Sequence, residues 1–179
     1  GLSASEKLAK ALNLSEGSPA WHRALHNLPS VERQFAGARA VTSFVHSPRL
    51  AFRCERATGQ RWAMLPSSVA FIDPLLSTGF PLTLLGIERL AVILAEGMEA
   101  PGFSQALGDY EKKTLMEADH AAGLIAAMYI NMDDFEVFAA LAFIYFTSVS
   151  FSESARRLGR CDLAKSFLLI DNPQFGPPV

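Results

Sequence analysis

The chain has 179 residues, of which half are hydrophobic and 19% are charged, a composition that excludes intrinsic disorder and is typical of one folded domain. Its formal net charge of −2 offers no basic surface to nucleic acid, so we expect none as a partner. The two cysteines, Cys54 and Cys161, match no paired spacing, which argues against a disulfide framework. A cytoplasmic, reducing setting is therefore expected. The first residue is Gly1, which indicates either a removed tag or a piece of a longer protein.

The chain order predicts four parts of one compact unit. Residues 1–37 carry helix start signals and form short helices. Residues 38–65 are rich in β-branched and aromatic residues and form a small antiparallel sheet, with strands at 40–46, 49–56 and 61–65. Residues 66–100 hold a turn and a helix from Pro81, and residues 101–179 form a helical C-terminal region. We expect its helices at 109–130, 133–158 and 162–170. The fold class is α+β, mainly helical.

The longest apolar run covers residues 137–149 and has 13 residues, fewer than the roughly 20 that a membrane span needs. We therefore expect a buried helix and no membrane. Most of the aromatic side chains around it are expected in the core, although some of them can instead line a flat, apolar ligand pocket. These side chains are Phe135, Phe138, Phe143, Tyr145, Phe146 and Phe151.

One segment reads differently from ordinary core. Asp73-Pro74 forces a turn, residues 77–79 read Ser-Thr-Gly, and Pro81 suits a first helical turn. The backbone N–H groups of residues 78–82 are then expected to be unpaired and, with the helix dipole, to attract a negatively charged group. Gly79 leaves room for close approach. A plain strand-to-helix connection with an Asx-type turn is the alternative.

Residues 71–90, FIDPLLSTGFPLTLLGIERL, resemble the FAD-contacting segment of flavin-dependent halogenases and related single-component flavoprotein monooxygenases. The stretches at 110–119 and 132–141 resemble the helical C-terminal region of such proteins. The resemblance extends from about Phe35 onward and implies FAD as cofactor. It implies that Thr78 and Gly79 form the halide-binding pair and that Asp73 and Pro74 pack against the cofactor. It also places Ser77 beside the flavin and Phe80 at the pocket wall.

The chain departs from that family in several places. Pro66 and Ser67 stand where the family has Gly-Asp, no Gly-x-Gly occurs anywhere, and the Trp-x-Trp-x-x-Pro motif has no counterpart. A dinucleotide-binding half needs a glycine-rich turn to hold the pyrophosphate. The resemblance therefore implies the later portion of an FAD-binding flavoprotein monooxygenase fold that lacks its Rossmann half, with the missing N-terminal FAD-binding half as a partner.

The resemblance implies that the parent protein is an oxidoreductase of halogenase or hydroxylase type. It would act on an aromatic or apolar small molecule, and this chain would be inactive alone. The second hypothesis is a non-catalytic helical module that binds an apolar ligand or a protein partner. Apolar surface left uncovered would then drive self-association into a homo-oligomer.

Two constellations are weak metal candidates. His22 and His26 lie one helical turn apart without the other residues of a zinc motif. Glu117 and His120 form a single Glu-x-x-His where a di-iron bundle needs two. We expect a surface or partly buried histidine pair and a solvated helix face, and no metal.

Three charged stretches have structural explanations. Asp133-Asp134 is expected to cap a helix and residues 111–113 to form a solvated first turn. Residues 156–157 read Arg-Arg near a helix end, where they complement the dipole; binding of a phosphate is the alternative.

Overall fold

The computed structural model describes residues 2, 4–60, 62–173 and 175, which divide into two compact units, 1–50 and 51–179. The first unit holds three short helices, α1 (Glu6–Ala11), α2 (Ser18–His26) and α3 (Pro29–Gln34), with a 3-10 turn η1 (Leu14–Glu16). These helices confirm the predicted helical character of the N-terminal segment. Pro19 and Pro29 each stand in the first turn of a helix, where a missing N–H costs nothing.

The first unit packs around one aromatic side chain. The indole of Trp21 lies 5.4 Å from the Phe35 ring and 6.0 Å from the Phe44 ring, measured between centroids. The predicted strand at residues 40–46 is absent, because this stretch is exposed coil. Val41 and Val45 are each 90% exposed. This stretch forms no backbone hydrogen-bond ladder with another described segment. Propensity alone does not make a strand without a partner.

The second unit carries all the described strands, and each has two residues. β1 (Phe52–Arg53) pairs antiparallel with β4 (Ala70–Phe71). β2 (Thr58–Gly59) pairs antiparallel with β3 (Trp62–Ala63). The predicted α+β class with a small antiparallel sheet is confirmed, but the predicted three-stranded sheet is wrong in detail. A fourth strand lies beyond residue 65, and the strands form two separate pairs.

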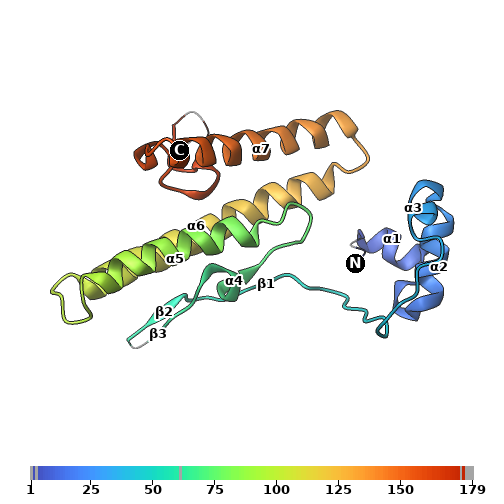
Figure 1. Ribbon diagram of the computed structural model, residues 1–179, viewed down its shortest axis with the longest axis horizontal. Coiled ribbons are helices and arrows are strands. Elements are labelled where there is room, and N and C mark those ends of the chain that lie inside the picture. The colour runs from blue at the N-terminus through green and yellow to red at the C-terminus, as the bar shows by residue number, and fades with distance from the viewer. Residues whose placement is uncertain (1, 3, 61, 174, 176–179) are drawn as a thin grey trace. The chain divides into compact units, whose positions relative to one another are not determined.

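Four helices make up most of the second unit: α4 (Pro66–Val69), α5 (Gly79–Ala95), α6 (Phe103–Ile130) and α7 (Phe135–Arg157). Figure 1 shows α5 and α6 side by side, with α7 following α6. α6 begins six residues before the predicted start at Asp109. Gly108 therefore lies inside the helix, although glycine has a low helix propensity. α7 begins after Asp134, whose carboxylate accepts the N–H of Val137 at 3.2 Å, which confirms the predicted cap.

The predicted helix at 162–170 is wrong. Two 3-10 turns, η2 (Cys161–Leu163) and η3 (Phe167–Leu169), replace it. Leu168 and Leu169 have φ of 54° and 56°, in the left-handed region that ends a right-handed helix. Both side chains are buried, so packing holds them there at a cost of roughly 1–3 kcal/mol each.

The core of the second unit joins α5, α6, α7 and the C-terminal turns. Its buried members are Leu82, Ala121, Tyr145, Phe167 and Leu168. The phenol of Tyr145 donates to the carbonyl of Leu76 at 2.9 Å, which ties α7 to the turn before α5. Burial raises the pKa of this phenol. The core thus fixes the segment in which the sequence places the site.

α7 is packed on one face only. Tyr145, Ser148 and Ala155 are its buried residues, whereas Phe135 and Phe143 are 79% and 77% exposed. Their predicted burial is therefore wrong for the described chain. By length and composition α7 is the one described helix that could cross a membrane, and 11% of its most apolar 18-residue stretch is buried. A single helix of this kind is weak evidence for a membrane span.

Candidate functional site at the start of helix α5

The turn before α5 is held by the carboxylate of Asp73. One oxygen of Asp73 accepts the backbone N–H of Leu75 at 2.6 Å, which is an Asx-type turn. The other accepts the hydroxyl of Tyr129, on α6, at 2.8 Å. Both oxygens are therefore engaged within the protein. Asp73 positions the turn, as the alternative interpretation of the sequence predicted.

The backbone next passes through a strained residue. Ser77 has φ of +53°, a conformation that costs a non-glycine residue energy and often marks a functional turn. Its N–H donates to the carbonyl of Pro74 at 3.3 Å. Because Tyr145 also binds the Leu76 carbonyl, the turn is fixed on both sides.

The first amides of α5 fall into two groups. The N–H of Phe80 donates to the Ser77 carbonyl at 3.2 Å, and that of Leu82 donates to the Thr78 carbonyl at 3.3 Å. Pro81 has no N–H to offer. The expectation of free amides throughout residues 78–82 is therefore wrong, because a tight turn and the first helical bond use two of them.

Two amides remain. Among the described residues, the N–H groups of Thr78 and Gly79 have no hydrogen-bond partner, and no side chain caps the helix. Thr78 is the N-cap residue and is 2% exposed. These are the two residues that the resemblance assigns to the halide. Unpaired N–H groups at a helix start are the standard binding element for an anion.

The space outside Gly79 is open. A Cβ built on this glycine meets no atom within 4 Å, so packing inside the described chain does not require glycine here. Phe80 follows directly and is 78% exposed. Its predicted place at a pocket wall stays a prediction. The open space therefore lies beside Gly79, whereas Thr78 is buried.

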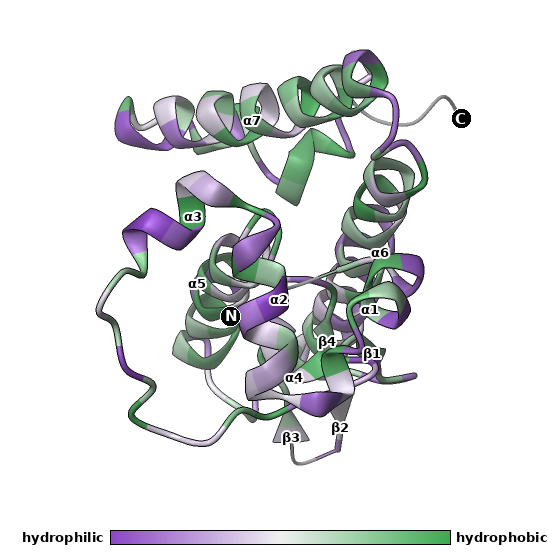
Figure 2. Ribbon diagram, turned by 90° about the vertical axis from the view of Figure 1, so that its right-hand side faces the viewer, coloured by the Kyte–Doolittle hydropathy of each residue, from purple (hydrophilic) through white to green (hydrophobic). Residues whose placement is uncertain are grey.

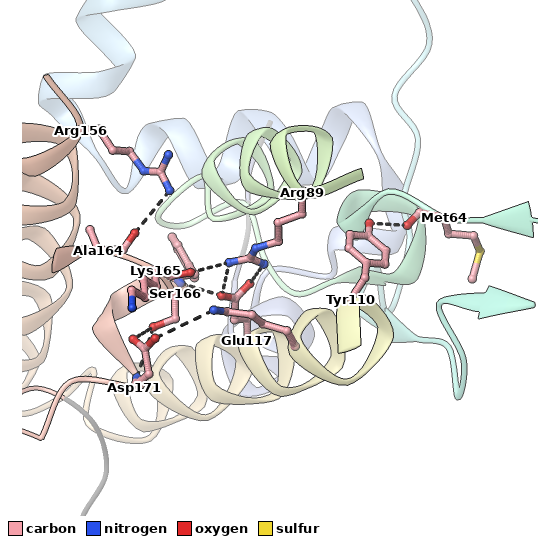
Figure 3. A network of polar contacts seen from close by, with 11 residues as sticks. Met64, Arg89, Tyr110, Glu117, Arg156, Ala164, Lys165, Ser166 and Asp171 are labelled. Carbon is pink, nitrogen blue, oxygen red and sulfur yellow. Dashed lines mark hydrogen bonds and ion pairs between the residues drawn. The ribbon is translucent and has the colours of Figure 1, made fainter. Parts of the chain in front are cut away.

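A buried ion pair joins α5 to α6. The guanidinium of Arg89 makes two 2.7 Å contacts with the carboxylate of Glu117 on α6, and Glu117 is 1% exposed. Glu117 also accepts the N–H of Phe167 at 2.8 Å, and Arg89 donates to the Lys165 carbonyl at 3.0 Å. Figure 3 shows this network joining three segments. The predicted solvated face at Glu117 is wrong. A lone arginine in an apolar helix was the available signal for a buried partner.

Residues 111–113, in the third turn of α6, are also more engaged than predicted. Glu111 accepts the N–H groups of Thr58 and Ala57, each at 2.7 Å, and these bonds lower the pKa of its carboxyl. Burial lowers the pKa of the Lys113 ammonium. Glu111 is therefore not simply solvated, because the β2 turn packs on it, and Lys113 is half-buried near Asp171, whereas Lys112 is exposed as predicted.

The remaining candidates are structural. His22 and His26 are both exposed, as predicted. Across the described residues no cluster of three histidine, cysteine or acidic side chains could hold a metal ion. His120 lies at a partly buried position that lowers the pKa of its imidazole. Arg156 binds the Glu88 carboxylate on α5 at 2.5 Å, a partner that the dipole argument did not predict.

Comparison with known proteins places these observations in a family context. No family model matches the chain. It is 34% identical to tetracycline 7-halogenase of Kitasatospora aureofaciens over 76 residues, or 42% of this chain and 14% of that enzyme. It is 29% identical to monodechloroaminopyrrolnitrin halogenase PrnC of Pseudomonas fluorescens over 117 residues, or 65% of this chain and 21% of the relative.

Solved structures agree in fold. The crystal structure of the halogenase PltM in complex with phloroglucinol and FAD matches with a TM-score of 0.70 at 22% identity, covering 80% of this chain and 29% of PltM. A second PltM structure gives a TM-score of 0.68. The chain thus spans less than a third of each protein that it matches. In sequence and in fold, the resemblance is confirmed: this chain is similar to part of the flavin-dependent halogenases.

Proposed function

We propose that this chain is the later portion of an FAD-dependent oxidoreductase of the halogenase type. The observation that carries the proposal is the pair of unpaired amides at Thr78 and Gly79. They lie in the segment with the most specific resemblance, at the start of a helix with open space beside it. We assign this pair to an anionic group, either the halide or the N1–C2 edge of the flavin.

The residues around the amides supply positioning. The Asp73 carboxylate and the Tyr145 hydroxyl hold the turn, while Pro74 and Ser77 shape it and Phe80 offers an apolar surface next to it. When bound, FAD supplies the oxygen chemistry of such enzymes. The glycine-rich half that seats the pyrophosphate is not among these 179 residues. We therefore propose that the isolated chain has no activity.

The proposed substrate class is supported by one structural neighbour. PltM was solved with phloroglucinol and FAD, and we propose an aromatic or otherwise apolar small molecule as the substrate of the parent protein. We propose that the parent is a cytoplasmic enzyme in which the exposed apolar residues of α7 are covered by the rest of the polypeptide. Both chlorination and hydroxylation are compatible with the same cofactor site.

The test uses the complete parent polypeptide. Purified parent protein should absorb between 350 and 500 nm from bound FAD. With reduced FAD, O₂, bromide and phloroglucinol as a probe substrate, it should yield brominated phloroglucinol, detectable by mass spectrometry. Gly79→Val should abolish halogenation, because the new side chain fills the open space. Gly123→Val is the matched control, since its Cβ also meets nothing within 4 Å, and should retain activity. Equal activity of the two variants would contradict the proposal.

A non-catalytic helical module is the second candidate. The exposed Phe135 and Phe143 of α7 favour it, because large apolar patches mark binding surfaces. A parent protein that takes up no flavin but pairs tightly with another protein or with a second copy would support this candidate and exclude the first.

A further inference from the structure

α5 has two apolar faces, and only one is used inside the described chain. Leu82 and Gly86 are its buried residues, on the face that meets α4 and α6. A second stripe, which we call the α5 stripe, consists of Phe80, Leu84, Ile87 and Leu94. Its members are 78%, 64%, 46% and 55% exposed. Figure 2 colours most of α5 as hydrophobic.

The spacing of the α5 stripe is that of a helix-packing seam. Its members are separated by four, three and seven residues, the heptad pattern with which one helix face meets a partner. At about 100° per residue the stripe lies opposite the buried face. Ala91 falls on the same line and leaves no charge within it. A helix that is apolar all round belongs in an interior, so this face needs a cover.

The α5 stripe begins next to the free amides, and this position indicates which partner covers it. Phe80 directly follows Thr78 and Gly79, whose free amides we assign to the flavin or halide. A cofactor-carrying partner approaches that end of α5, where the stripe begins at Phe80. A second copy of this chain cannot complete such a site, because it contains no Gly-x-Gly. The matched parts also occupy only 14% and 21% of the curated relatives, so most of their length lies elsewhere.

We propose that the α5 stripe is the docking face for the dinucleotide-binding half of the same flavoprotein. The partner surface is apolar and uncharged opposite Leu84 and Ile87, since a charge buried there would have no counter-charge. This inference rests on the proposed function, and it adds that α5 couples cofactor seating to packing between the two halves.

The test compares two variants in two settings. Leu84→Asp changes the stripe, and Val92→Asp is the control, because Val92 is 59% exposed on the same helix but lies off the stripe. In the 179-residue chain both side chains face solvent, so both variants should melt within about 2 °C of each other. In the complete parent, Leu84→Asp should lower the melting temperature by roughly 5 °C or more, since it buries an unpaired charge, and should reduce the bound FAD. Val92→Asp should do neither.

The outcomes separate this inference from the proposed function. A wild-type parent without flavin absorbance overturns the proposed function. A parent that binds FAD but tolerates Leu84→Asp as well as Val92→Asp overturns the stripe alone. A dimer of the 179-residue chain that Leu84→Asp dissociates, together with an unaffected parent, shows that a second copy covers the stripe and also overturns the inference.

Discussion

The buried pair between Arg89 and Glu117 allows a quantitative prediction. Removing one partner of a buried, hydrogen-bonded ion pair typically costs about 3–5 kcal/mol, because the other charge stays buried. Glu117→Gln keeps one carbonyl oxygen for either Arg89 or the Phe167 N–H, so we expect the lower end, about 3 kcal/mol. Urea unfolding of the 179-residue chain, followed by circular dichroism at 222 nm, measures the change in unfolding free energy.

The double variant Arg89→Met/Glu117→Met is the critical comparison. Replacing both charges is often close to neutral, which leaves the unpaired Phe167 N–H at about 1–3 kcal/mol. The double variant should therefore be no less stable than Glu117→Gln. Glu153→Gln is the control, since its pair with Arg157 is exposed and should change stability by less than ~1 kcal/mol. A loss below ~1 kcal/mol for Glu117→Gln, set against the 3–5 of a buried pair, would refute the reasoning.

Further predictions concern packing, pH and the turn. Gly86→Ala should destabilise the chain by more than ~1 kcal/mol, because its Cβ would lie 2.3 Å from Cδ of Pro66. Gly123→Ala meets no atom and should stabilise it by roughly 0.5–1 kcal/mol; the two unfolding curves decide the matter. Because burial lowers the pKa of His120 below its ordinary 6.5, the unfolded state takes up the proton first, so stability should fall as pH drops below 6.5. His120→Gln should flatten that slope, and an unchanged slope would exclude His120 as its source. Asp73→Ala removes the two hydrogen bonds that the Asp73 carboxylate accepts and should speed amide exchange at Leu75.

Much of the second unit follows from local sequence signals. Asp134 is a strong N-cap, Gly97 and Gly159 follow helix ends with φ of 94° and 69°, and Asp73-Pro74 makes the predicted turn. These features depend on a few neighbouring residues. For the same reason, the two proline-initiated helices of the first unit were predictable.

The rest depends on contacts between distant residues. Nothing local shows that Glu117 is buried beneath Arg89, or that Leu168 and Leu169 adopt positive φ, because tertiary packing imposes both. The strand prediction at 40–46 failed since β-propensity needs a partner. The burial predicted for Phe143 failed because α7 uses only one face within the described residues.

The candidate site was predicted in part. The resemblance identified Thr78 and Gly79, and the two remain the unpaired amides of the helix start. The Leu82 bond is the ordinary first bond of a helix that begins at Gly79, two residues before the expected start at Pro81. The Phe80 bond closes the turn at Ser77, whose positive φ no sequence signal announces in a non-glycine residue.

The most direct test of the central claim follows individual backbone amides by ¹⁵N NMR in the 179-residue chain. Bromide replaces a larger organic anion in steps, at constant ionic strength and in a buffer without sulfate. We predict that the Thr78 and Gly79 resonances shift progressively, while those of Phe80 and Leu82, which already donate to carbonyls, shift far less. Equal shifts at all four amides, or none at Thr78 and Gly79, would contradict the claim that this helix start binds an anion.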